Sequence, residues 1–209
     1  MTKGLFPLFL KLEGRKCLVV GAGAIGEGKI HGLLQTGAKV RVVAPKATKR
    51  VQRWASGGGI LWLRREFRES DLDNCFCVVA ATSSNALHKR IFQLARQRGV
   101  LCNVVDVPEL CDFYYPAVVR RGALQIAIST SGESPALAQR LRKELERQFG
   151  PEYAEWVKRL GKSRRKLNAS SEDADKKKSQ LHSLASGNSF LVFQQQFCKP
   201  LRSAKKAKA

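Results

Sequence analysis

Three glycines near the start of the chain have the spacing of a dinucleotide-binding turn. Gly21, Gly23 and Gly26 form the pattern G-x-G-x-x-G between an apolar segment and an amphipathic one. In such a turn the first glycine permits the bend, the second lets the backbone approach a pyrophosphate, and the third lets helix and strand pack closely. The N–H groups of Ala24 and Ile25 would face the phosphates. The pattern predicts a nicotinamide dinucleotide site; the alternative is a structural turn without a ligand.

The acid that commonly binds the adenosine ribose is missing from its expected place. An Asp or Glu at the end of the second strand would accept hydrogen bonds from the ribose of NAD. This chain has Val43, Ala44, Pro45 and Lys46 there instead. We expect Pro45 and Lys46 to lie beside the adenosine, where a lysine can also accept the additional phosphate of NADP. The residues alone leave NAD and NADP equally open.

Asp106 is the second candidate for chemistry, because it follows the apolar segment 101–105. Ligands of open α/β sheets bind at the carboxyl ends of the parallel strands, and Asp106 is expected at such an end. A carboxylate in this place can accept a proton from a substrate that also loses hydride. The alternative is an aspartate that caps a turn before Pro108.

Apolar and amphipathic segments alternate in the part of the chain that must position these residues. We expect strands at 16–20, 39–43, 60–63, 75–80 and 101–105, and helices at 25–35 and 85–97. Apolar strands alternating with helices are typical of a parallel sheet covered on both faces. The sequence therefore predicts an α/β fold with a Rossmann-like doubly wound parallel sheet. Beyond it we expect a strand at 124–129 and helices at 134–149 and 152–166.

The chain is strongly basic. Its 209 residues include 38 Lys and Arg against 17 Asp and Glu, a formal net charge of +21. This charge favours anionic partners, such as nucleic acid, a membrane surface or a polycarboxylate ligand. No nucleic-acid-binding motif accompanies it, no segment is long enough to span a bilayer, and the N-terminal apolar run is too short for a signal peptide. We expect a cytoplasmic protein with reduced cysteines, no metal site, and no membrane or nucleic-acid partner.

Three longer stretches are "GLFPLFLKLEGRKCLVVGAGAIGEGK", "VVAATSSNALHKRI" and "CNVVDVPELCDFYYPAVVRRGALQIAISTSGESPALAQRLRKELE". They resemble the N-terminal domain of siroheme synthases. The N-V-V-D, F-x-x-P-A and S-P-x-L-A-x-x-L-R elements carry the resemblance, which covers residues 4–165. The chain is similar to the precorrin-2 dehydrogenase and sirohydrochlorin ferrochelatase family in its stand-alone form, without the methyltransferase half.

The resemblance implies a reaction, a cofactor and a set of site residues. The reaction is the NAD-dependent oxidation of precorrin-2 to sirohydrochlorin in siroheme biosynthesis, followed in many relatives by insertion of Fe2+. NAD is favoured over NADP, because the family commonly uses NAD without the ribose-binding acid. Asp106 becomes the catalytic base. The cofactor-binding residues are Gly21, Gly23, Ala24, Ile25, Gly26, Pro45, Lys46 and Thr82, and the substrate-binding residues are Asn103, Phe113, Arg120 and Arg121.

Further residues are candidates for holding the macrocycle. Cations can bind the carboxylates of precorrin-2 by charge-assisted hydrogen bonds, whereas flat aromatic rings suit the macrocycle itself. The candidates besides those above are Lys29, Arg140, Arg142, Tyr114 and Tyr115. For each cation the alternative is a solvated surface charge.

The resemblance also divides the chain. Residues 1–112 are expected to form the NAD-binding Rossmann domain, residues 113–149 a dimerisation region of a homodimer, residues 150–166 a helical segment and residues 167–209 a basic tail. The polar run "NASSEDADKKKSQ" predicts disorder in that tail. In some relatives a serine before the helix at 134–149 is phosphorylated; Thr130 matches it here, between Ser129 and Ser131. The alternatives to a dehydrogenase with chelatase activity are a dehydrogenase alone or a nucleotide-binding module without catalysis.

Overall fold

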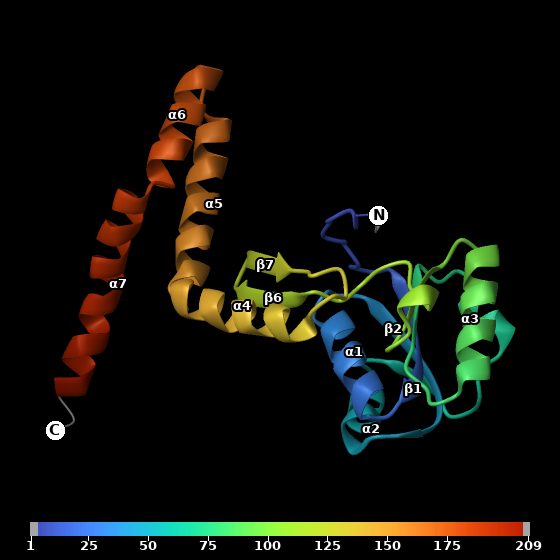
Figure 1. Cartoon of the computed structure of the whole chain (residues 1–209). Helices are drawn as coiled ribbons and strands as arrows, with labels where there is room; N and C mark the ends of the chain where they lie inside the picture. Colours follow the sequence, from blue (N-terminus) through green and yellow to red (C-terminus); the bar gives the residue numbers. More distant parts are fainter. Residues whose placement is uncertain (1–3, 207–209) are drawn as a thin grey trace. The chain divides into compact units, whose positions relative to one another are not determined.

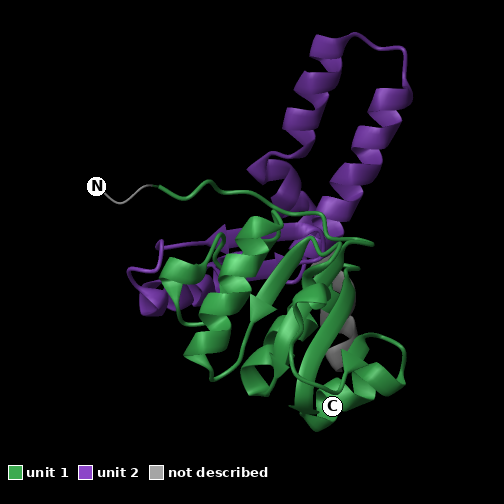
Figure 2. Cartoon of the chain, turned by 90° about the vertical axis from the view of Figure 1, so that its right-hand side faces the viewer, with its two compact units in different colours: residues 1–115 green, residues 116–209 purple. Residues whose placement is uncertain are grey.

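The computed structural model describes residues 4–206 and the side chains of residues 4–196. The chain forms two compact units, Met1–Tyr115 (unit 1) and Pro116–Ala209 (unit 2), shown in different colours in Figure 2. Unit 1 therefore ends at Tyr115 rather than at the expected residue 112. In the described residues no helix is both long and apolar enough to cross a membrane.

Unit 1 is built on a five-stranded parallel sheet with the strand order β3-β2-β1-β4-β5. Figure 1 labels β1 and β2 of this sheet. Its strands are β1 (Lys16–Ala22), β2 (Lys39–Ala47), β3 (Leu61–Leu63), β4 (Cys77–Ala80) and β5 (Leu101–Val104). The chain proceeds outward from β1 to β3 and then returns to β4 on the other side of β1. The strand order reverses between β1 and β4, where ligands of such sheets bind. The predicted doubly wound parallel sheet is confirmed.

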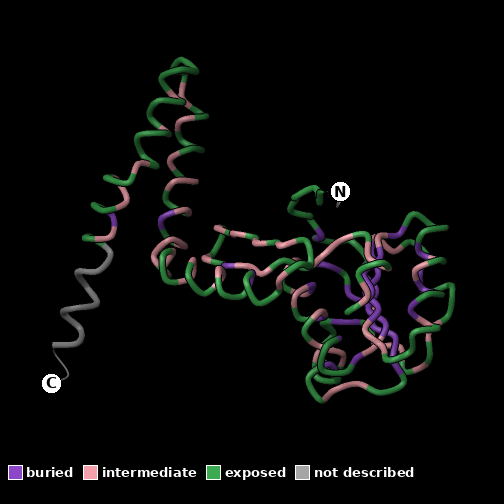
Figure 3. Tube along the Cα trace, in the orientation of Figure 1, coloured by how far each residue is buried: buried purple, intermediate pink, exposed green. Residues whose placement is uncertain are grey.

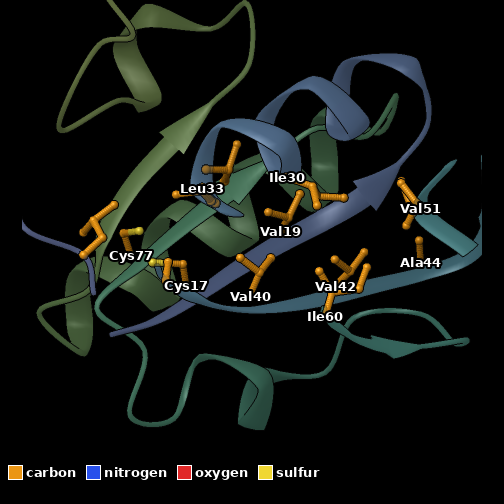
Figure 4. Close-up of a cluster of buried hydrophobic side chains, with 14 residues drawn as sticks. Cys17, Val19, Ile30, Leu33, Val40, Val42, Ala44, Val51, Ile60 and Cys77 are labelled. Atoms are coloured by element: carbon orange, nitrogen blue, oxygen red, sulfur yellow. The ribbon is translucent and has the colours of Figure 1, made fainter. Parts of the chain in front are cut away.

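Helices cover both faces of this sheet. Helices α1 (Ala24–Leu34) and α2 (Lys49–Ser56) contribute to one buried cluster, and α3 (Asn85–Gln97) contributes to the other. Alternate strand residues supply the two clusters, Val19 and Val42 to the first, Leu18 and Val43 to the second. Figure 4 shows the first cluster, and Figure 3 shows how buried positions concentrate in the strands. Burial on both faces explains why the strands read as continuous apolar runs.

The sequence predicted α3 with its observed bounds but did not predict α2. Ser84 caps α3, because its hydroxyl accepts a hydrogen bond from Leu87 N at 3.3 Å. Helix α2 has its own cap in Thr48, whose hydroxyl accepts from Val51 N at 3.3 Å. Its apolar residues include Val51 and Trp54 at helical spacing, but a helix of eight residues with three cations is too short to stand out in the sequence.

Unit 2 begins with a two-stranded antiparallel sheet of β6 (Ala117–Arg121) and β7 (Leu124–Ile128). Four helices follow, α4 (Pro135–Gln148), α5 (Tyr153–Ala169), α6 (Ala174–Leu184) and α7 (Gly187–Lys206). Ser134 caps α4 by accepting from Leu137 N at 3.2 Å, and Pro135 occupies the first helical position. The strand β6 was not predicted, because only five residues separate Pro116 from Gly122.

The prediction of disorder for residues 167–209 is wrong for the residues that the structure describes, since α6 and α7 lie there. Asp173 caps α6 by accepting from Asp175 N at 3.0 Å. Aromatic rings pack between α5 and α7: the ring centroids of Tyr153 and Phe190 lie 4.3 Å apart, and those of Trp156 and Phe193 5.0 Å apart. Burial of these rings offsets the entropy of ordering a polar segment.

Asp71 anchors the connection between β3 and β4 through a buried ion pair. It lies in the short 3-10 helix η1 (Glu69–Leu72) and is 2% exposed. Its carboxylate accepts from Arg65 Nη1 at 2.8 Å, from Arg65 Nη2 at 2.6 Å and from Arg68 N at 2.8 Å. Burial alone would raise the pKa of Asp71, but these bonds outweigh it and the pKa is lowered.

We expect Asp71→Asn to lower the free energy of unfolding by about 1–3 kcal/mol at neutral pH, because a bidentate charged acceptor is lost. A lowered pKa in the folded state stabilises the fold above the ordinary pKa of aspartate, and this contribution is lost as the pH falls through the folded-state value. Urea unfolding should therefore show a difference between the two proteins that shrinks in acid. Asp73→Asn is the control, because Asp73 is exposed and its ion pair with Arg98 is long at 3.6 Å. Equal stability of Asp71→Asn and the parent protein at neutral pH would refute the anchoring role.

Candidate functional site

The glycine turn at the carboxyl end of β1 has two closed positions and one open one. Gly21 has φ +101°, and a Cβ atom there would collide with the carbonyl oxygen of Ala81. A Cβ atom on Gly26 would collide with the carbonyl oxygen of Gly21. Gly23 has extended backbone, and a Cβ atom there would meet no atom within 4 Å. The fold itself requires Gly21 and Gly26, whereas the space above Gly23 is open to a ligand.

The start of α1 faces this open space. Gly23 is the N-cap of α1 and supplies no side-chain acceptor, so the N–H groups of Ala24 and Ile25 have no partner within the helix. Ile25 is 55% exposed. Free N–H groups and the positive end of a helix dipole attract an anionic group. This arrangement fits the pyrophosphate of a dinucleotide.

Thr82 lies next to Gly21 of the glycine turn. It follows β4, and its Cγ2 atom would be 3.3 Å from a Cβ atom placed on Gly21. Its hydroxyl accepts from Ser84 N at 3.4 Å. Gly21 and Thr82 thus flank the point where the strand order reverses, which agrees with the predicted place of the cofactor.

The end of β2 runs beside the glycine turn and meets an acid of α1 that sequence reasoning missed. Strand β2 continues to Ala47, which pairs with Ala22, and Thr48 N donates to Ala22 O at 3.1 Å. The hydroxyl of Thr48 donates to Glu27 Oε2 at 2.6 Å. Pro45 and Lys46 are exposed in this strand end. Glu27 belongs to α1, 21 positions before Thr48, so spacing along the chain gave no signal for this pair.

Asp106 follows β5 and is exposed, with a left-handed backbone of φ 62°. Such a φ is strained for most residues, although Asp and Asn tolerate it better than others. The turn is closed by the backbone, because Val107 N donates to Val104 O at 3.3 Å. No donor among the described residues hydrogen-bonds to the Asp106 carboxylate. The side chain therefore does not act as a turn cap, and a strained residue without a structural bond favours a functional role.

After Asp106 the chain turns and runs back beside β5. Asn103 and Cys111 form an antiparallel bridge, and Asp112 Oδ2 accepts from Cys102 N at 2.9 Å. Asn103 is 6% exposed, and its Nδ2 donates to Phe113 O at 2.8 Å. Asn103 was predicted to bind substrate; in the structure its amide group instead holds the returning segment that bears Phe113.

Three aromatic residues follow in the returning segment. The ring centroids of Phe113 and Tyr115 lie 5.7 Å apart, and the hydroxyl of Tyr114 donates to Pro108 O at 3.4 Å. Phe113 is partly buried and packs against the apolar cluster to which α1 and α2 contribute, whereas Tyr115 is 42% exposed. The predicted substrate-binding Phe113 thus lies on the α1 side of the sheet, in the segment that Asn103 holds.

Lys29 brings a cation from α1 to the same region. Its Nζ atom lies 3.7 Å from the ring centroid of Tyr115, a cation–π geometry. Burial lowers the pKa of Lys29, while the negative charge of Asp106 opposes that shift. The structure therefore places Lys29, a predicted carboxylate ligand, within electrostatic reach of Asp106.

The predicted arginine ligands belong to unit 2, whereas the glycine turn and Asp106 belong to unit 1. The guanidinium of Arg121 donates to Phe149 O at 2.8 Å and to Glu146 O at 2.9 Å, which satisfies carbonyls at the end of α4. This favours a structural role for Arg121, while Arg120 is exposed. Within α4, Arg140 and Arg142 pair with Glu144 and Glu146 respectively.

The loop before α4 contains the residues that match the phosphorylated serine of some relatives. Thr130 is half-buried, and its hydroxyl accepts from Ser134 N at 3.1 Å. Ser129 accepts from Ser131 N at 3.1 Å, and Ser131 is exposed with φ 53°. These bonds give Ser129 and Thr130 a part in closing the loop.

Within the described residues no group of three or more His, Cys, Asp or Glu side chains is arranged to hold a metal ion. Five cysteines of unit 1 are free thiols. Of these, Cys17 and Cys77 pair in register on β1 and β4 and lie side by side in Figure 4. The titratable groups that the structure brings to the end of β5 include Asp106 and Lys29, whereas Glu27 lies beside the end of β2.

Comparison with known families and proteins assigns both parts of the chain. Residues 8–117 match the family described as "Putative NAD(P)-binding", and residues 121–148 match "Sirohaem biosynthesis protein central". A siroheme synthase of Nitrosococcus oceani is 42% identical over 140 residues, which are 67% of this chain and 30% of that protein. One of Neisseria meningitidis is 41% identical over 159 residues, 76% of this chain and 33% of that protein. The chain thus spans about a third of the length of these relatives.

A solved structure covers nearly the whole chain. It is that of SirC, a precorrin-2 dehydrogenase, which matches with a TM-score of 0.80 and 29% sequence identity. The match covers 95% of this chain and 100% of SirC. The fold of both units is therefore found in the solved chain of SirC.

Proposed function

Because the chain belongs to the family of siroheme synthase N-terminal domains and precorrin-2 dehydrogenases, we propose that it oxidises precorrin-2 to sirohydrochlorin with NAD in siroheme biosynthesis. The observation that carries the proposal is the free carboxylate of Asp106 at the same sheet edge as the open glycine turn. A proton acceptor and a dinucleotide site are what a dehydrogenation requires. A module that only binds nucleotides would have no use for a strained, unbonded aspartate.

The residues of unit 1 would have separate roles in binding the cofactor and in accepting the proton. The N–H groups of Ala24 and Ile25 bind the pyrophosphate, and the missing Cβ atom of Gly23 lets it approach. NAD, when bound, accepts the hydride that precorrin-2 loses. Asp106 accepts the accompanying proton at its carboxylate oxygen. Overall, precorrin-2 loses one hydride, which converts NAD to NADH, and one proton.

Lys29 and the returning segment would prepare the site. The ammonium of Lys29 attracts the carboxylate of Asp106 and a carboxylate of the substrate alike. Asn103 fixes the segment from Cys111 to Phe113 and so holds an aromatic ring near the macrocycle. Arg120 stays a predicted substrate ligand, since it is an exposed cation on β6. The net charge of +21 supports attraction of a polycarboxylate substrate.

Purified full-length protein should convert precorrin-2 to sirohydrochlorin when NAD is supplied, with NADH followed by its absorbance and the macrocycle by its own spectrum. We expect NADP to serve less well than NAD. Heat-denatured protein is the control for uncatalysed oxidation. A protein that binds NAD tightly but leaves precorrin-2 unchanged would instead be a nucleotide-binding module.

The same assay, continued with Fe2+ as the second substrate, tests the chelatase activity that some relatives combine with the oxidation. Insertion of the metal requires loss of protons from the pyrrole nitrogens, and Asp106 would accept them as well. Siroheme formed faster than in the protein-free control would show that both activities are present. Sirohydrochlorin that accumulates unmetallated would show a dehydrogenase alone.

We propose further that the protein is a cytoplasmic homodimer formed through residues 113–149. The two-stranded ribbon β6–β7 has an unpaired edge on each side, which favours pairing with a second copy. In this region Leu137 is 38% exposed. The free thiols of unit 1 support a reducing compartment. Sedimentation equilibrium of the full chain measures the oligomeric state, and a monomer at all concentrations would exclude the dimer.

A further inference from the structure

The segment after β2 is held beside the glycine turn by a backbone hydrogen bond and by one acid, Glu27. Thr48 N donates to Ala22 O at 3.1 Å, which places Thr48 next to the turn that begins α1. In doubly wound folds the adenosine ribose binds between this turn and the end of the second strand. The end of the second strand itself, Val43 to Lys46, contains no acid.

Glu27 brings a carboxylate to this place from the α1 side. Its Oε2 atom accepts the hydroxyl of Thr48 at 2.6 Å, and its Oε1 atom lies 3.5 Å from Arg50 Nη1. The Glu27 side chain is 23% exposed, against 50% for Arg50. A carboxylate offers about four acceptor positions, so Glu27 keeps capacity for further hydroxyl donors.

Around Glu27 the charges are otherwise positive. The segment 46–53 contains Lys46, Lys49, Arg50 and Arg53 and no acid, and the first turn of α2 has no acidic residue. Without Glu27, this cationic segment would favour the additional phosphate of NADP. With Glu27, a phosphate at this place meets a like charge, whereas a ribose hydroxyl meets an acceptor.

We propose that Glu27 replaces the acid missing from the end of β2 and selects NAD against NADP. The inference rests on the proposed dinucleotide site and names the residue that sets its cofactor preference. Thr48 positions the carboxylate, and Arg50, 3.5 Å from it, is a cation that a phosphate at this place would still meet.

Binding of NADH and NADPH to the full-length protein, measured by titration calorimetry, tests this without any turnover. The parent protein should bind NADH more tightly than NADPH. Glu27→Gln keeps an oxygen that accepts from Thr48 but removes the charge. We expect it to shift the ratio of the two dissociation constants toward NADPH by about tenfold or more, since a like-charge repulsion is removed.

Two further variants control the result. Glu69→Gln also removes an acid paired with an arginine, Arg90 at 2.8 Å, but on η1, and should leave the ratio unchanged. Arg50→Gln should weaken NADPH binding and change NADH binding little, which tests the arrangement even if Glu27→Gln does not fold. The proposal is overturned if the parent protein prefers NADPH, if Glu27→Gln keeps the parent ratio, or if Arg50→Gln leaves NADPH binding unchanged.

Failure of this inference can be told apart from failure of the proposed function. Tight, selective NADH binding that responds to Glu27→Gln, without oxidation of precorrin-2, would support the selectivity and refute the enzyme. Oxidation of precorrin-2 at equal rates with NAD and NADP would support the enzyme and refute the selectivity. Binding of neither dinucleotide would refute both.

Discussion

Replacing Asp106 by asparagine should lower kcat for precorrin-2 oxidation by about 10²- to 10⁴-fold, the range for loss of a positioned general base. An amide cannot accept the proton that the substrate loses. Asparagine tolerates the φ of 62° that Asp106 adopts, and no hydrogen bond to the carboxylate is lost within the described residues. The variant should therefore fold with unchanged stability, measured by thermal unfolding, and bind NADH as the parent protein does.

Glu109→Gln is the matched control for Asp106→Asn. Glu109 is an exposed acid in the next 3-10 helix, η2 (Pro108–Leu110), so its loss changes the net charge equally and leaves the proposed base in place. We expect its kcat to stay within about twofold of the parent value, since it makes no contact with the proposed site. Full activity in Asp106→Asn would refute the base, whereas equal losses in both variants would indicate a general effect of charge.

Gly23→Ala should weaken NAD binding about 5- to 150-fold, because a methyl group forced into a fitted contact costs about 1–3 kcal/mol. The structure separates this effect from folding. A Cβ atom on Gly23 meets no protein atom within 4 Å, and its φ of −74° and ψ of −171° suit alanine. Stability should therefore change by only about 0.5–1 kcal/mol, the difference between Gly and Ala at an N-cap. Calorimetric titration with NADH and urea unfolding measure the two quantities.

Gly28→Ala provides the control within the same helix. A Cβ atom on Gly28 also meets nothing within 4 Å, but Gly28 lies more than a turn beyond the N-cap. Alanine there should stabilise α1 slightly, by about 1 kcal/mol or less, and leave NADH affinity unchanged. If Gly23→Ala binds NADH as tightly as Gly28→Ala does, the open space above Gly23 is not the pyrophosphate site.

The fold of unit 1 follows from the sequence because its signals are local. The apolar runs of β1 and β4 and the periodic α3 each contain their own pattern, and the glycine turn between β1 and α1 fixes their connection. Helix α2 has only eight residues and depends on Thr48 and Glu27 for its start. The helices after residue 170 depend on rings of α5, far away in the chain. Such tertiary contacts carry no local signal.

The candidate site was predictable in part for the same reason. Gly23 and Asp106 were found because each lies at a strand end, and the structure shows one open to ligands and the other free of structural bonds. Asn103 and Arg121 were predicted as ligands from their neighbours in the motif. The structure gives both a partner in the fold instead. Glu27 was missed because its proposed role depends on contacts with Thr48 and Arg50, which lie more than twenty residues later in the chain.

The central claim is that this chain transfers a hydride from precorrin-2 to NAD, with Asp106 taking the proton. The most direct measurement is a single-turnover reaction without dioxygen, in which limiting precorrin-2 is mixed with the protein and excess NAD. The account predicts that NADH and sirohydrochlorin appear together and in equal amounts, and that both are nearly absent with Asp106→Asn. Sirohydrochlorin formed without NADH, or precorrin-2 left unchanged with NAD and with NADP, would contradict it.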